Sequence, residues 1–101
     1  MTFGLSESDY QILNDYLILP LKTSYAKVYV FGSRARGQNH PFSDIDILFE
    51  EDPQHPIPIE RISLFKDRLE NSNMTVKVDL VNWNNLAESY KPSVLKDRIL
   101  I

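Results

Sequence analysis

The chain has 101 residues, of which 43% are hydrophobic and 25% charged, as in an ordinary folded protein. This length predicts a single domain over residues 1–101 with one modest core, and it leaves no room for a separate substrate domain. The formal net charge of −3 argues against broad binding to nucleic acid, whose backbone attracts basic surfaces. The absence of cysteine excludes disulfides and thiolate metal sites. No apolar run approaches the ~20 residues of a membrane span, so the sequence predicts a cytoplasmic protein.

The first predicted elements are a helix and a strand. Ser6 with acidic neighbours is typical of a helix start, because a serine oxygen accepts hydrogen bonds from free amides. Apolar residues then recur at helical spacing until Pro20, which is expected to bend or end the helix. Residues 26–31 are rich in β-branched and aromatic side chains, and they predict a strand that leads directly into Gly32.

A glycine turn, GSRARG over residues 32–37, follows this strand. Gly32 can turn the chain with a positive φ, and we expect a short polar helical segment whose first amides, around Ser33, point at phosphate oxygens. Arg34 and Arg36 are candidates for contact with a triphosphate, because guanidinium groups pair well with phosphate. Their spacing does not decide between them.

Two aspartates alternate in the next predicted strand, residues 44–49. Side chains two apart in a strand project from the same face, so Asp44 and Asp46 lie together while Ile45 and Ile47 face the other way. Neighbouring carboxylates require a cation, and their hard oxygen atoms suit Mg²⁺. The pattern therefore indicates metal-assisted phosphoryl or nucleotidyl transfer.

The second half of the chain predicts another helix and a third strand. Prolines between residues 53 and 58 exclude regular structure there, and we interpret the acids before them as a solvated strand end. A helix is expected from Pro58 to about residue 70. In the strand predicted over residues 75–81, Asp79 is the natural third acid, positioned to accept the proton of an attacking hydroxyl.

The end of the chain is expected to contain a short helix or turn over residues 83–90 and a last segment over residues 92–101. This segment closes on three aliphatic residues. A tail so apolar is either packed into the core or part of an interface, and the sequence does not choose between these.

Together these residues resemble the minimal nucleotidyltransferases of the DNA polymerase β superfamily. The signature of that family is Gly-Ser, ten residues and then Asp-x-Asp, and here Gly32-Ser33 is followed at that spacing by Asp44 and Asp46. A later acid on a strand is matched by Asp79. The order of the elements and the resemblance predict an α+β domain of the small, polymerase β-like nucleotidyltransferase fold, with a mixed β-sheet and helices packed on one side.

The resemblance implies that Asp44, Asp46 and Asp79 are catalytic and bind Mg²⁺, with two ions expected. ATP would be the nucleotide substrate, and AMP would pass to an acceptor hydroxyl with release of pyrophosphate. The residues expected to bind the nucleotide are Gly32, Ser33, Arg34 and Arg36.

The resemblance also implies a protein partner. Such minimal domains are commonly paired with a small helical HEPN-domain ribonuclease, as antitoxin and toxin, and they adenylylate a tyrosine of the toxin. Two alternatives remain open at this point. The domain could be a nucleotide-binding module that neutralises or scaffolds its partner by contact alone, or it could transfer a nucleotide to a small molecule or to RNA.

Overall fold

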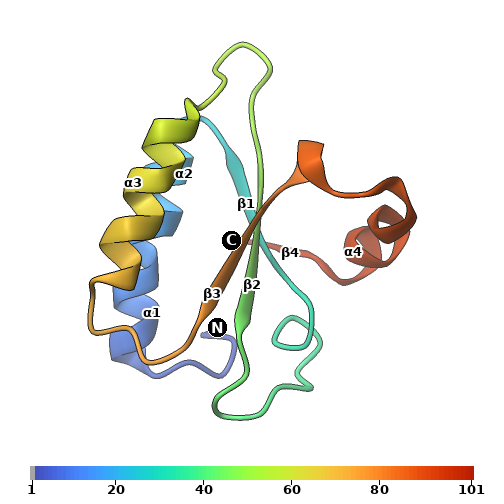
Figure 1. Ribbon diagram of the computed structural model, residues 1–101. Helices are drawn as coiled ribbons and strands as arrows, with labels where there is room; N and C mark the ends of the chain where they lie inside the picture. The colour runs from blue at the N-terminus through green and yellow to red at the C-terminus, as the bar shows by residue number, and fades with distance from the viewer. Residues whose placement is uncertain (1) are drawn as a thin grey trace.

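A computed structural model describes residues 2–101, which form a four-stranded sheet with helices on both faces (Figure 1). The elements in chain order are helix α1 (Glu7–Leu13), the π-helical turn η1 (Asn14–Ile18), helix α2 (Leu19–Thr23), strands β1 (Lys27–Phe31) and β2 (Ile45–Glu50), helix α3 (Ile59–Glu70), strand β3 (Val78–Asn82), the 3₁₀ turns η2 (Trp83–Asn85) and η3 (Glu88–Tyr90), helix α4 (Lys91–Asp97) and strand β4 (Ile99–Leu100).

The first helical layer continues past the proline that was expected to bend or end it. The Ser6 hydroxyl caps α1 as predicted, but α1, η1 and α2 follow one another without a break as far as Thr23. The amide of Leu19 donates to the carbonyl of Asn14, which is the wider spacing of a π-turn. Pro20 is the second residue of α2, a position where its missing N–H costs little.

The sheet is mixed, as predicted, with the strand order β3-β2-β1-β4. Strand β1 pairs antiparallel with both β2 and β4, whereas β2 and β3 are parallel and are connected by α3. Strand β3 begins three residues later than expected, because Thr75 is bound elsewhere. Its amide and hydroxyl donate to the carboxylate of Asp9, a buried residue of α1.

The main core lies between the sheet and the layer formed by α1, α2 and α3. The helices and the sheet both contribute fully buried side chains to this core: Leu13, Leu17, Leu21, Val28, Val30, Ile45 and Ile47. On the predicted apolar stripe of α3, Phe65 and Leu69 are buried while Ile59 is 76% exposed. Apolar burial of this kind is the main term that stabilises so small a domain.

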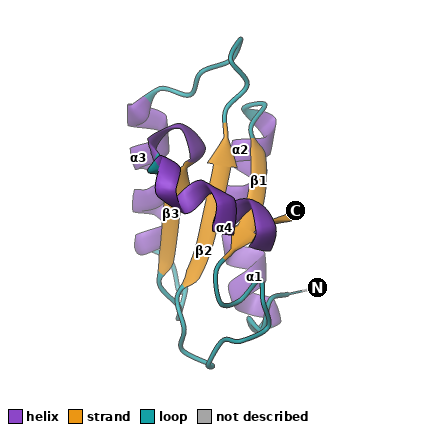
Figure 2. Cartoon of the chain, turned by 90° about the vertical axis from the view of Figure 1, so that its right-hand side faces the viewer, coloured by secondary structure: helices purple, strands orange, loops and turns teal. Residues whose placement is uncertain are grey.

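A second, smaller core lies on the opposite face of the sheet, so the helices are not confined to one side. Here Val94 of α4 packs with Tyr29 of β1 and Leu48 of β2. Figure 2 shows α4 crossing in front of the strands, with α1, α2 and α3 behind them. This second layer is short, and it leaves the ends of β2 and β3 nearest the glycine turn uncovered.

The apolar end of the chain is part of the fold. Strand β4 pairs with β1, and the amide of Ile101 donates to the carbonyl of Val28 at 3.0 Å. Ile99 and Ile101 pack against the main core, while Leu100 between them is 62% exposed. Of the two options left open by the sequence, the tail takes the first. None of the helices over residues 2–101 is both long enough and apolar enough to cross a bilayer.

Candidate active site

Three aspartates meet on the face of the sheet that carries α4. Asp46 lies on β2 directly beside Asp79 of β3, because the parallel register pairs these two residues. Asp44 lies two residues before Asp46, just outside the strand. The intervening Ile45 and the following Ile47 are fully buried in the main core, so the aspartates project from the other face. The structure therefore brings together the three acids that the sequence singled out.

The electrostatics of Asp46 reflect this crowding. Its pKa is raised above the usual value of 3.8, first by partial burial, then by the negative charges of Asp79 and Asp44. The positive charge of Arg36 acts in the opposite direction and lowers the pKa of Asp46. Lys77 Nζ lies 3.6 Å from Asp79 Oδ1, but both side chains are too exposed for this ion pair to contribute much to stability. Ionised Asp46 is thus destabilised by its neighbours, and a bound cation would relieve that repulsion.

The position of the Asp46 carboxylate depends on Gly32. Strand register puts Asp46 opposite Phe31, the residue before Gly32, and Gly32 itself has a φ of +76°. A Cβ at this glycine would meet Asp46 Oδ2 far inside van der Waals contact and would lie 3.2 Å from its Cγ. Only a residue without a side chain lets the turn and the carboxylate approach so closely.

The segment after Gly32 is a series of turns and not the short helix that was expected. The amide of Arg36 donates to the carbonyl of Gly32 at 3.2 Å, and the amide of Gln38 donates to that of Ser33 at 2.9 Å. Ser33 is half-buried within these turns. No regular helix develops because Gly37, with a φ of +71°, ends the segment after one turn.

Arg34 differs from the expectation that it contacts phosphate, because its side chain is only 2% exposed. Its guanidinium donates to the carbonyl oxygens of Phe3 at 2.9 Å and of Ser43 at 2.8 and 3.0 Å. Further bonds reach the carbonyls of His40 and Pro41. Arg34 thereby fastens the loop before Asp44 to the start of the chain, and its donors are used in holding the site together.

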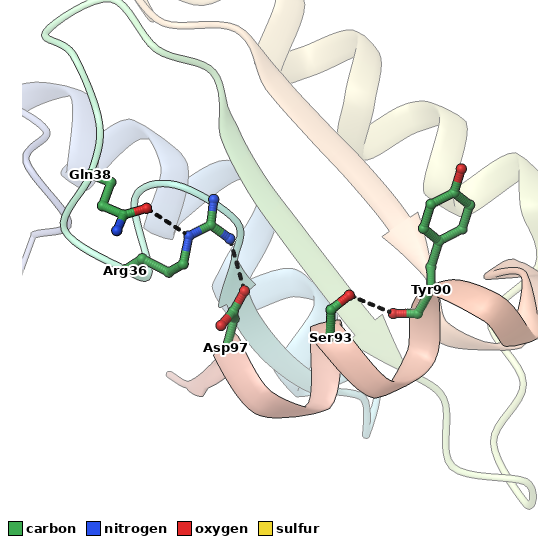
Figure 3. Close-up of polar contacts among 5 residues, drawn as sticks. All are labelled: Arg36, Gln38, Tyr90, Ser93 and Asp97. Carbon is green, nitrogen blue, oxygen red and sulfur yellow. Dashed lines mark hydrogen bonds and ion pairs between the residues drawn. The ribbon is translucent and has the colours of Figure 1, made fainter.

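Arg36, in contrast, is exposed beside the acids. Its Nη1 forms an ion pair with Asp97 of α4 at 2.8 Å, and its Nε donates to the side chain of Gln38 at 3.1 Å (Figure 3). The guanidinium is thus held between the glycine turn and α4. Of the two arginines, Arg36 has the position from which a triphosphate could be reached, which the sequence alone did not decide.

The three aspartate carboxylates are ligands of the kind that suits Mg²⁺, although they do not surround a common point. Within residues 2–101, no three His, Cys, Asp or Glu side chains are arranged to hold a metal ion as they stand. Asp44, Asp46 and Asp79 nevertheless offer hard carboxylate oxygens on one face, and partial burial together with the charges of Asp79 and Asp44 raises the pKa of Asp46. Glu51, which follows β2, is engaged elsewhere, since it accepts from the amide of Ile57 and from the side chain of Asn82.

Helix α4 contributes residues that the sequence did not identify as part of the site. Asp97 contacts Arg36, and Ser93 lies on the same side of the helix, as does Tyr90, which ends η3 and caps α4 (Figure 3). Their spacing in the sequence is helical, which marks them as one stripe. No local signal shows that this stripe borders the aspartates, because that depends on which sheet face α4 covers.

Comparison with known proteins shows which family the chain matches. Residues 17–101 match the model of the family described as polymerase beta, nucleotidyltransferase. Over 75 residues the chain is 28% identical to a protein of Haemophilus influenzae named as a probable protein adenylyltransferase, MntA. The match covers 73% of this chain but 63% of that relative, so the chain spans less than two thirds of its length.

Two solved structures share the fold. A crystal structure of a Sulfolobus solfataricus protein, assigned as a nucleotidyltransferase, has a TM-score of 0.51 and 26% identity, covering 89% of this chain and 76% of its own. A toxin–antitoxin crystal structure with AMP-PNP has a TM-score of 0.63 and 24% identity, covering 86% and 70%. The α+β fold is therefore that of the polymerase β-like nucleotidyltransferases. Because the family model matches most of this chain, the chain belongs to the polymerase beta nucleotidyltransferase family.

Proposed function

We propose that this domain transfers AMP from Mg-ATP to a hydroxyl group of a partner protein. The observation that carries the proposal is the convergence of Asp44, Asp46 and Asp79 beside a glycine turn that packs directly on Asp46. Clustered carboxylates next to a turn that also carries Ser33 and Arg36 are an arrangement suited to metal-dependent phosphate chemistry.

The residues divide into two groups in this reaction. The carboxylates of Asp44, Asp46 and Asp79 would hold Mg²⁺, as two ions, which when bound supplies positive charge for the attacking and leaving oxygens. Asp79 accepts the proton of the acceptor hydroxyl as its oxygen bonds to the α-phosphorus and pyrophosphate departs. Ser33 and Arg36 bind the β- and γ-phosphates, Ser33 through its hydroxyl and nearby amides and Arg36 through its guanidinium.

We propose a HEPN-domain ribonuclease toxin as the partner, with one of its tyrosines as the acceptor, so that the domain acts as the antitoxin. Three observations support this proposal. The Haemophilus influenzae relative is named for protein adenylyl transfer, and one solved structure with this fold is a toxin–antitoxin with AMP-PNP. The family signature of Gly32-Ser33 and the three aspartates is intact.

Calorimetry with ATP, in the presence and absence of Mg²⁺, tests the nucleotide site. We expect Mg²⁺-dependent binding by the wild type and its loss in Asp44→Asn/Asp46→Asn. The matched control is Asp15→Asn/Glu50→Gln, which removes the same charge away from the aspartates and should bind normally. Binding that survives the first double variant, or that needs no metal, would contradict the proposal.

Transfer itself is tested with radiolabelled ATP and the purified cognate partner. The expected result is label on a tyrosine of the partner, with no label when Asp79→Asn replaces the wild type. A partner that stays unlabelled although the domain binds Mg-ATP would instead favour neutralisation by contact. Label on RNA or on a small molecule would assign a different acceptor.

A further inference from the structure

Helix α4 lies immediately beside the three aspartates. Val94 is buried against Leu48, and Leu48 follows Asp46 by two residues on β2, so both project from the same face of the sheet. Two residues along a strand correspond to about 7 Å. The helix therefore crosses the sheet one side-chain row away from the acids and forms one wall of the space above them.

Contacts on both sides of α4 fix the side that it turns toward the acids. Lys91 and Arg98 lie over the ring of Trp83, at 5.0 and 5.1 Å from its centroid, beyond the far end of β3. Asp97 reaches Arg36 on the opposite side. Figure 3 shows Tyr90, which ends η3 and caps α4, and Ser93 and Asp97 of α4 projecting on one side, and the Asp97–Arg36 pair places that side next to the face that carries the three aspartates.

The two ends of this stripe lie above different strands. Helix α4 follows β3 and leads into β4, which pairs with β1, so it crosses the sheet from the β3 side to the β1 side. Asp97 thus lies by the glycine turn at the end of β1. Tyr90 lies seven residues earlier, about 10 Å back along the helix, which is also the distance from β1 to β3.

The ring of Tyr90 is 63% exposed on this wall. Within the described chain, the backbone amide of Tyr90 donates to the carbonyl of Ala87 at 3.0 Å and its backbone carbonyl accepts from Ser93 Oγ at 3.4 Å. The aromatic face is therefore available, at the opposite end of the wall from the residues assigned to phosphate. A nucleotide bound with its β- and γ-phosphates at Ser33 and Arg36, and its α-phosphate at the aspartates, would have its nucleoside directed toward Tyr90.

We propose that Tyr90 binds the nucleobase by stacking and that α4 is the nucleoside-binding wall of the site. This inference rests on the proposed nucleotidyl transfer and adds the residue that holds the base. Stacking on an aromatic ring tolerates any base, since each has a π face, so Tyr90 supplies affinity for nucleosides more than choice among them.

The test is calorimetry with two probes, Mg-ATP and Mg-tripolyphosphate, which share the phosphate chain but differ in the base. Tyr90→Leu should weaken Mg-ATP about 5- to 100-fold, the range for one base stacked on an aromatic ring, and leave tripolyphosphate within about twofold. Tyr90→Phe keeps the ring and should bind both probes as the wild type does. Tyr16→Leu, an exposed tyrosine on the helical layer behind the sheet, is the matched control and should change neither.

Each other outcome overturns the inference in a distinct way. Unchanged Mg-ATP affinity in Tyr90→Leu would show that the base lies elsewhere. Equal losses for both probes would indicate a disturbed phosphate site, and a loss in Tyr90→Phe would indicate that the hydroxyl is the group in contact. If the wild type binds neither probe, the proposed nucleotide site itself is refuted.

Discussion

Substitution of Gly32 by alanine should separate the stability of the domain from its ability to bind metal and nucleotide. With a φ of +76°, alanine at this position is strained by about 1–2 kcal/mol. Its Cβ would also meet Asp46 Oδ2 well below the 3.0 Å at which real Cβ contacts begin. Because that oxygen is the free end of a short side chain, the carboxylate turns away and little further stability is lost. Because Asp46 is a proposed metal ligand, however, its displacement is expected to weaken Mg-ATP binding about 10- to 100-fold.

Gly37→Ala is the matched control, because Gly37 has a similar φ of +71° but no atom within 4 Å of the added Cβ. Both variants should lose 1–2 kcal/mol in urea unfolding. In calorimetry, only Gly32→Ala should lose Mg-ATP affinity. In an Asp46→Ala background the new Cβ would lie at an ordinary 3.5 Å from the Cβ of residue 46, so only the cost of φ should remain. Equal Mg-ATP affinities for the two glycine variants would refute the assignment of Gly32 as the residue that positions Asp46.

Three further outcomes are expected. Asp46→Asn should raise the unfolding free energy of the metal-free domain by about 0.5 kcal/mol at pH 7, where solvent screens part of the repulsion. Because the pKa of Asp46 is raised in the folded state, ionisation of Asp46 lowers stability at a pH above that pKa. In urea titrations at a series of pH values, the gain should therefore vanish below pH 3.8. Mg-ATP affinity should fall on acidification at a higher pH than an ordinary aspartate predicts, since protons compete for Asp46, and Asp46→Glu should shift that profile. Arg34→Lys should cost about 3 kcal/mol, because an ammonium cannot reach the separate carbonyls of Phe3 and Ser43; a loss below 1 kcal/mol would contradict the buried role.

The sequence predicted the part of the site that depends on alternation within strands. Ile45 and Ile47 are buried because they alternate with Asp44 and Asp46, and that pattern is visible in one dimension. Alternation within a strand does not show that Asp79 lies beside Asp46 on the neighbouring strand. This arrangement depends on the register of the parallel β2–β3 pair, which α3 and its flanking loops set through three-dimensional packing.

The two arginines show why local spacing was insufficient. Arg34 and Arg36 are two residues apart in the same turn, and both suit phosphate by chemistry. Arg34 is buried because its acceptors include the carbonyl of Phe3, which precedes the whole helical layer in the sequence. Arg36 is exposed because its partner Asp97 comes from α4. In the same way, the position of Tyr90 follows from the packing of Val94 on the second face of the sheet, which no periodicity in so short a helix reveals.

The parallel pairing of β2 with β3 has a consequence for how this domain folds. Asp46 and Asp79 are separated in the chain by the whole of α3, so the carboxylates become neighbours only when a long loop has closed. An unfolded chain therefore has no divalent-ion site, and Mg-nucleotide should bind the native state alone. By mass action, each tenfold excess of free ligand over its Kd then adds about 1.4 kcal/mol to the unfolding free energy. The melting temperature of the domain thus becomes a direct report of its nucleotide occupancy, before any acceptor is known.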